Sequence, residues 1–164
     1  MNCPNKILGV SRPRNGITIA EILSRYLVAP RPASVLLKID IEGEEWPVFE
    51  NLAAADLDVF AQIVCEFHSF DKGWHSKWRS ALGAMRNLRD RFEVIHVHGN
   101  NNEPHALIAN VPFPRVLEVT FANKARYRFT HRTEVYPSEI DQPNLTNAPD
   151  LFLGNFKFSN LTLG

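Results

Sequence analysis

The chain lacks the features that would assign it to an extreme class of protein. Its 164 residues contain 18 basic and 18 acidic side chains, so no global field draws it to nucleic acid or to an anionic membrane. No apolar run is long enough to span a membrane, and the N-terminus lacks the apolar core of a secretion signal. The two cysteines, Cys3 and Cys65, indicate free thiols rather than a disulfide framework. We therefore expect a cytoplasmic protein that binds neither nucleic acid nor membrane.

The spacing of the glycines excludes several common active sites. No two of the eight glycines are close enough to form a Gly-x-Gly turn. A phosphate loop and a dinucleotide fingerprint both need such closely spaced glycines, because the backbone must approach the phosphates. The Gly-x-Ser-x-Gly elbow of the usual α/β-hydrolase is also missing.

The length and the 45% hydrophobic content are sufficient for one domain with a sizeable core. We predict a single domain over residues 1–164. From about residue 124 the chain is expected to be a loop-rich tail, because Pro137, Pro143 and Pro149 lie there among polar residues.

The hydrophobic pattern alternates between strand and helix spacing over the first hundred residues. Helices are predicted from Thr18, which forms a capping box with Glu21, and over residues 46–53 and 76–91; strands are predicted over residues 35–41, 63–68 and 92–98. This order indicates parallel strands joined by helical crossovers. On the last helix, the spacing predicts a buried stripe of Trp78, Leu82, Met85 and Leu88.

Two later β-type runs have no helix between them. Residues 105–110 and 116–121 are separated by Pro112 and Pro114, which favours an antiparallel hairpin at the edge of the sheet. The predicted fold class is therefore α/β, with parallel strands, flanking helices and an antiparallel edge hairpin.

Polar side chains follow each of the three predicted parallel strands. In an open α/β sheet, ligands bind at the carboxyl ends of the strands, and a carboxylate there loses hydration that a bound group can replace. For Glu44 and Glu45 the simpler interpretation is attraction to the N-terminus of the next helix. The residues at the strand ends are Asp40 and Glu42, then Glu66 and His68, then His98 with Asn100, Asn101 and Asn102.

Such a set of side chains allows several kinds of chemistry. It could bind a cation, deprotonate a hydroxyl group, or hold a divalent metal through oxygen and imidazole ligands. His96, inside its strand, is more typical of a hydrogen-bonded core histidine than of a ligand. A metal hydrolase stays open as an alternative, although a His-x-His pair alone is a weak zinc signal.

Four motifs in order resemble a known family. They read LKIDIEGEEW over 37–46, IVCEFH over 63–68, HVHGNN over 96–101 and PRVLEVTF over 114–121. Over roughly residues 17 to 145, the chain resembles the C-terminal half of FkbM-like S-adenosylmethionine-dependent methyltransferases. The resemblance implies a partial class I methyltransferase (Rossmann-like) sheet, in which the first two motifs are the fourth and fifth strands and the later β runs the antiparallel sixth and seventh. The family's N-terminal glycine-rich cofactor motif has no counterpart in this sequence.

The resemblance also implies an activity, O-methylation of a small molecule or sugar with S-adenosylmethionine as cofactor. Asp40 would lie near the transferred methyl group, and Glu42, Glu66 and His68 would shape the same catalytic cleft. Asp40 or His68 could act as the base, or a divalent metal held by Asp40, Glu66 and His68 could lower the pKa of the acceptor. His98, Asn100 and Asn101 are predicted to bind the substrate.

The alternative is a non-catalytic binding or assembly module derived from a methyltransferase fold. In that case an open sheet edge is expected to be covered by a partner or by self-association, because an unpaired strand edge attracts another chain.

Overall fold

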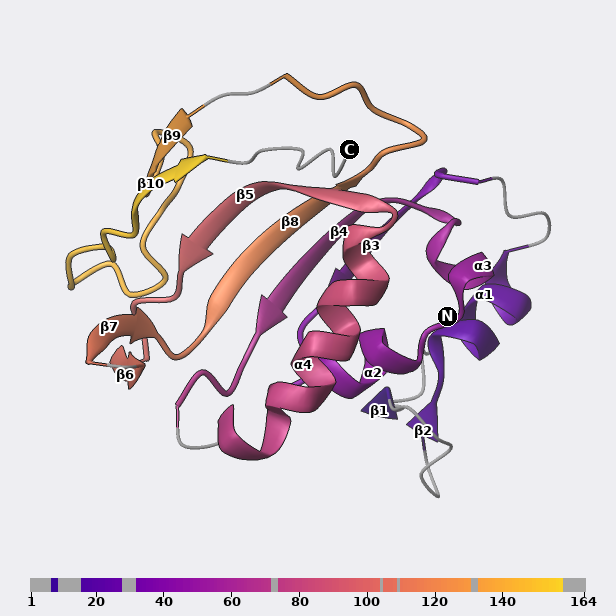
Figure 1. The fold of residues 1–164 in the computed structure, drawn as a ribbon, viewed down its shortest axis with the longest axis horizontal. Coiled ribbons are helices and arrows are strands. Elements are labelled where there is room, and N and C mark those ends of the chain that lie inside the picture. The colour runs from indigo at the N-terminus through magenta and orange to yellow at the C-terminus, as the bar shows by residue number, and fades with distance from the viewer. Residues whose placement is uncertain are drawn as a thin grey trace.

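The centre of the computed structural model is a four-stranded sheet (Figure 1). The structure describes residues 7–8, 16–27, 32–71, 74–103, 105–108, 110–130 and 133–157; Cys3 lies outside these ranges. The strands lie in the order β3 (Val35–Ile39), β4 (Phe60–Phe67), β8 (Leu117–Asn123) and β5 (Phe92–Gly99). β3 and β4 are parallel, while β8 is antiparallel to both β4 and β5.

Helices pack against one face of this sheet. They are α1 (Ile19–Tyr26), α2 (Glu45–Asn51), α3 (Ala54–Leu57) and α4 (Trp74–Arg89). The predicted capping box is present, since the Thr18 hydroxyl accepts from the Glu21 N–H and the Glu21 carboxylate accepts from the Thr18 N–H. None of the described helices has both the length and the apolar character needed to cross a membrane.

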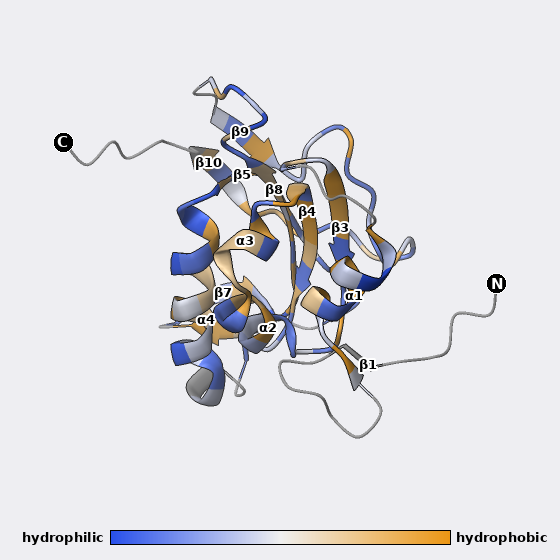
Figure 2. Ribbon diagram, turned by 90° about the vertical axis from the view of Figure 1, so that its right-hand side faces the viewer, coloured by the Kyte–Doolittle hydropathy of each residue, from blue (hydrophilic) through white to orange (hydrophobic). Residues whose placement is uncertain are grey.

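Alternation along β4 builds the core. Ile63, Cys65 and Phe67 point to the helical face and are at most 1% exposed, and Cys65 is a free thiol. Phe67 stacks on Trp46 of α2 with ring centroids 4.2 Å apart. Figure 2 shows this pattern as hydrophobic strands beside a helix α4 whose outer side is hydrophilic. Since successive side chains of a strand point to opposite faces, Glu66 points to the other face.

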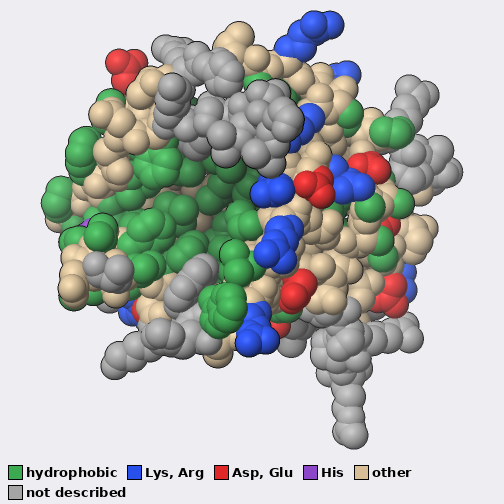
Figure 3. All heavy atoms as spheres, in the orientation of Figure 1, with side chains coloured by type: hydrophobic (Ala, Val, Ile, Leu, Met, Phe, Trp, Pro, Cys, Tyr) green, Lys and Arg blue, Asp and Glu red, His purple; other side chains and the backbone are tan. Residues whose placement is uncertain are grey.

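The predicted buried stripe of α4 is wrong in its first half. Leu88 is fully buried, but Trp78 and Leu82 are 41% and 45% exposed, and the buried positions include Ala81 and Ala84 instead. The reason is the close approach of α2: a Cβ added at Gly83 would lie 2.9 Å from the Glu50 side chain. Small residues fit such a contact, so the larger side chains lie beside it. Figure 3 shows a broad hydrophobic area on this side of the molecule, next to a band of Lys and Arg.

The predicted edge hairpin is also wrong in its pairing. β6 (His105–Ile108) pairs with β7 (Val111–Pro114) in a separate antiparallel ribbon. The next run, β8, instead enters the central sheet between β4 and β5. Within the described residues the four-stranded sheet has one parallel and two antiparallel pairs. The third predicted strand, β5, runs in the same direction as β3 and β4 but is separated from β4 by β8, so the predicted Rossmann-like sheet of adjacent parallel strands is not confirmed.

The chain beyond β8 folds back over the sheet. β9 (Thr133–Tyr136) and β10 (Gly154–Lys157) form a two-stranded antiparallel ribbon, and the residues between them contain no helix or strand. Tyr136 is 1% exposed and its ring packs edge-on against His96 and Phe156. A third short ribbon, near the N-terminus, pairs β1 (Ile7–Leu8) in parallel with β2 (Gly16–Ile17).

Candidate active site

The carboxyl ends of β3 and β4 bring four predicted residues together. Ile39 pairs with Cys65, which places the residues that follow each strand side by side. His68 Nε2 lies 3.9 Å from Asp40 Oδ1, 3.6 Å from Glu42 Oε2 and 4.0 Å from Glu66 Oε1. One imidazole is thus surrounded by carboxylates from the two neighbouring strand ends.

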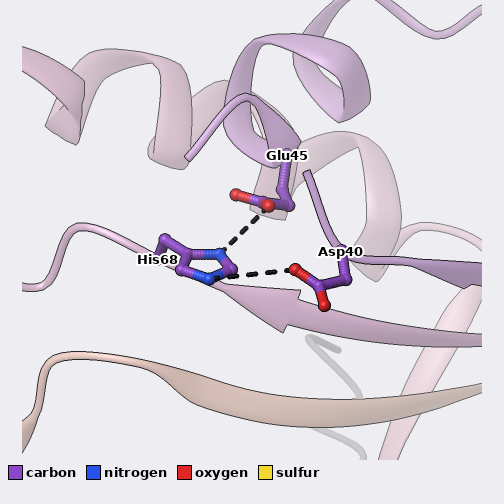
Figure 4. Close-up of side chains that lie close together, drawn as sticks. All are labelled: Asp40, Glu45 and His68. Atoms are coloured by element: carbon purple, nitrogen blue, oxygen red, sulfur yellow. Dashed lines mark hydrogen bonds and ion pairs between the residues drawn. The ribbon is translucent and has the colours of Figure 1, made fainter. Parts of the chain in front are cut away.

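A fourth carboxylate, Glu45, lies behind this imidazole and is fully buried. Figure 4 shows Glu45 at one ring nitrogen of His68 and Asp40 at the other. The Glu45 carboxylate accepts hydrogen bonds from the N–H of Ile41 at 2.8 Å, from the N–H of Gly43 at 3.0 and 3.2 Å, and lies 3.1 Å from His68 Nδ1. Burial opposes ionisation of Glu45, but the bonds from His68 and the backbone outweigh it and lower the pKa. Glu45 is therefore a buried anion with its own backbone cradle.

The loop that forms this cradle needs an unusual backbone. Glu42 and Gly43 both have positive φ, at 57° and 99°, and in this turn the Gly43 N–H points to the Glu45 carboxylate. A Cβ at Gly43 would also lie 3.1 Å from the Ser69 hydroxyl oxygen. Glycine at position 43 thus meets both a conformational and a steric requirement.

Glu45 fixes the proton arrangement of His68. Because its carboxylate accepts a hydrogen bond, His68 carries a proton on Nδ1, and Nε2 faces Asp40, Glu42 and Glu66. The hydrogen bond to Glu45 is the largest cause that raises the pKa of His68 to about 9, and the charges of Glu45, Glu66 and Glu42 add to it against the effect of burial. At neutral pH His68 is therefore an imidazolium ion. The indole N–H of Trp46 donates to the His68 carbonyl at 2.8 Å and holds the backbone.

Glu42, Glu66 and His68 line a pocket of about 320 Å³. Its charged lining consists of Glu42, Glu66, Asp71, Glu103, His68 and Arg115. The predicted residue Asn100 also lines it and donates to Glu66 Oε1 at 2.8 Å. Burial raises the pKa of Glu66, and the neighbouring charges of Asp40 and Glu118 raise it further against the bond from Asn100.

The other two predicted substrate-binding residues lie in a different environment. His98 is 4% exposed, with Nδ1 3.3 Å from Glu118 and Nε2 3.0 Å from Asp150 of the tail. Burial would lower the pKa of His98, but the bonds to Asp150 and Glu118 outweigh it and raise the pKa. The Asn101 amide donates to tail carbonyls and accepts from the Leu145 N–H. Both side chains hold the tail on the sheet, and their role in substrate binding stays a prediction.

Sequence reasoning missed the part played by Glu45. Its proximity to the start of a helix favoured an interaction with the helix N-terminus, and Glu45 does lie in the first turn of α2. Its carboxylate, however, binds the preceding loop and His68. Glu44 is the N-cap residue without a side-chain cap bond, and it pairs with Lys77 at 3.1 Å. The sequence does contain one signal for this role. Glu45 stands two residues after Gly43, and this spacing allows its carboxylate to turn back to the loop.

Three residues of the site could hold a metal ion. Asp40, Glu45 and His68 each offer a ligand atom within 4.8 Å of the others. The set predicted from the sequence had Glu66 in place of Glu45. A metal would need a deprotonated His68. The Glu45 oxygens already accept backbone hydrogen bonds. A set made of His68 Nε2, Asp40 and Glu66 would therefore bind a metal without breaking those backbone bonds.

Comparison with known protein families gives one result for this chain. The family described as methyltransferase FkbM domain matches residues 10–111. This range contains the four carboxylates around His68, and it confirms the resemblance drawn from the motifs. No curated protein sequence and no solved structure matches the chain.

Proposed function

This chain belongs to the FkbM methyltransferase family, and we propose that it catalyses S-adenosylmethionine-dependent O-methylation of a small molecule or sugar. One arrangement supports this activity: His68, oriented by the buried Glu45, lines a pocket together with Glu66, and its Nε2 lies 3.9 Å from Asp40. A histidine held by a carboxylate at one nitrogen is a common general base at the other.

Methyl transfer to oxygen requires an acceptor that loses its proton and is aligned with the methyl donor. His68 Nε2 can accept the hydroxyl proton, while Glu45 stabilises the imidazolium that forms. At neutral pH His68 already carries a proton, because its pKa is raised to about 9. A cationic ligand beside Asp40, Glu42 and Glu66 would offset their negative field, lower the pKa of His68 and free the base. Asp40 is the second candidate base, with a side chain 38% exposed.

The residues at the strand ends fit the charged part of the cofactor. When bound, S-adenosylmethionine supplies an electrophilic methyl group attached to a sulfonium cation. The carboxylate of Asp40 lies beside His68 at the end of β3 and suits a positive charge. The sequence has no Gly-x-Gly turn for the remainder of the cofactor, so affinity for the whole molecule is the property to measure.

Calorimetry with two forms of the cofactor tests this proposal. We expect micromolar binding of S-adenosylmethionine, and methyl transfer from radiolabelled cofactor to a hydroxylated acceptor. Asp40→Asn should weaken binding of S-adenosylmethionine more than that of S-adenosylhomocysteine, which lacks the sulfonium charge. Asp90→Asn is the matched control, since Asp90 is exposed and precedes β5 at the opposite end from the site.

Absence of S-adenosylmethionine binding to the folded chain would contradict the enzyme and favour the non-catalytic module. The metal route through Asp40, Glu66 and His68 makes a separate prediction. It requires a stoichiometric divalent ion in the purified protein and loss of turnover with a chelator.

We also propose that the chain acts in the cytoplasm and that a partner or a second copy covers its sheet edge. β3 is one of the two edge strands of the four-stranded sheet, and Leu36 on it is 60% exposed. Light scattering after size-exclusion chromatography measures self-association. A monomer at high concentration would contradict coverage of the β3 edge by a second copy, and a different partner would then be required.

A further inference from the structure

The charges around the pocket do not favour an anionic acceptor. Four carboxylates line it, from Glu42, Glu66, Asp71 and Glu103. Among the described lining residues, two side chains can carry positive charge, Arg115 and His68. The balance is therefore negative even when His68 is protonated.

Arg115 would be the natural group to bind a phosphate or carboxylate, because its planar fork matches these anions. Its guanidinium is already bound, with one terminal nitrogen on Asp71 and the other 3.3 Å from Glu103. A third anion would have to displace one of these partners. Arg115 thus shapes the pocket wall without offering an anion site.

The other face of the pocket suits a positive charge. Glu66 lies beside His68, which also contacts Asp40, and opposite Glu118 on β8. A bound cation would reduce the repulsion between these carboxylates. Ser69, Asn100 and Asn102 supply neutral polar groups in the same lining, which suit hydroxyl groups.

Resting on the proposed function, we propose that the acceptor is a polyol that carries a protonated amine, with an amino sugar as the simplest example. The ammonium group lies against Glu42 and Glu66, and the hydroxyl groups contact the neutral polar lining. A volume of about 320 Å³ is at the small end of ligand pockets, which span about 300–1,000 Å³, so a single ring fits this proposal better than an oligosaccharide.

Three ligands with the same ring test this preference: glucosamine, glucose and glucose 6-phosphate. Titrations of the full chain followed by ¹H–¹⁵N NMR report weak binding at the resonances of the pocket residues. We expect glucosamine to bind on the order of five- to tenfold tighter than glucose, with glucose 6-phosphate the weakest. Added salt should reduce the difference between glucosamine and glucose, because it screens exposed charges.

Two variants and one control make the test specific. Glu42→Gln should weaken glucosamine severalfold and leave glucose unchanged; the Glu42 side chain is 87% exposed, so folding is not at risk. The double variant Asp71→Asn with Glu103→Gln frees Arg115 and should make glucose 6-phosphate the preferred ligand. Asp90→Asn removes the same charge from the far end of β5 and should change nothing.

Equal binding of the three ligands, tightest binding of glucose 6-phosphate by the unmodified chain, or no shifts at the pocket with any of them would each overturn this inference. The outcome is separate from that of the cofactor titration. A chain that binds S-adenosylmethionine but shows no preference for the amine keeps its methyltransferase assignment and loses only the acceptor class.

Discussion

The raised pKa of His68 makes the stability of the fold depend on pH. In the folded chain the pKa is about 9, against an ordinary value of 6.5, so the folded state binds this proton more tightly than the unfolded state. The resulting stabilisation is complete below about pH 6.5 and is lost as the pH rises through about 9. At about 1.4 kcal/mol per pKa unit, the free energy of unfolding should fall by about 3 kcal/mol across this window.

Urea unfolding at a series of pH values between 6 and 10 measures this loss. His98 titrates in the same direction, because its pKa is also raised, so the contribution of His68 must be isolated. His68→Gln keeps a neutral N–H donor for Glu45 but does not titrate. The difference between the unmodified chain and this variant should therefore contain the expected loss, while His98 contributes equally to both.

Glu45→Gln provides a second, independent reading. It removes the largest cause of the raised pKa but keeps an oxygen that can accept from the Ile41 N–H. NMR titration should show a lower pKa for His68 in this variant, and its unfolding free energy should depend less steeply on pH. If the unmodified chain and His68→Gln lose the same stability between pH 6.5 and 9, the Glu45–His68 pair does not hold the proton as described.

Three further substitutions test other parts of the site. Asp40→Asn should lower methyl transfer by about 10²–10⁴-fold if Asp40 is the base, and a turnover assay that shows no loss would remove it from that role. Asp150→Asn deprives His98 of one of its two charged partners and should cost about 1–3 kcal/mol; limited proteolysis should then cut residues 137–153 faster, and an unchanged rate would contradict the tail contact. Gly43→Ala should cost about 1–2 kcal/mol in urea unfolding, because its φ is 99°.

The sequence contained enough information to bring Asp40, Glu66 and His68 together. Each follows or ends a strand that the apolar pattern marks clearly, and the helix between the strands makes them parallel neighbours. The meeting of their side chains then follows from strand geometry, because parallel strands end at the same edge. The hydrophobic pattern was therefore sufficient to predict the pairing of β3 and β4, which follow each other along the chain.

The hydrophobic pattern was not sufficient to predict the pairing of strands that are far apart in the sequence. The run 116–121 is β-type in the sequence, but its period does not tell whether its partner is the nearby β6 or the more distant β4 and β5. Its buried side chains Val119 and Phe121 extend the same core face as Cys65 and Ile63, so the choice was decided by the area buried in the central sheet. The exposed Trp78 has the same origin, because the contact between α2 and α4 selects small residues.

The position of β8 also decides which histidine faces the pocket. Glu118 of β8 lies opposite Glu66 on one side and opposite His98 on the other, and neighbouring strands are about 4.8 Å apart. His98 is therefore two strands, or about 10 Å, away from Glu66 rather than next to it. At that distance the carboxylate of Asp150 reaches His98 from the tail, with Oδ1 3.0 Å from Nε2. No strand separates His68 from the carboxylates of Asp40 and Glu66, so its Nε2 remains directed at the pocket.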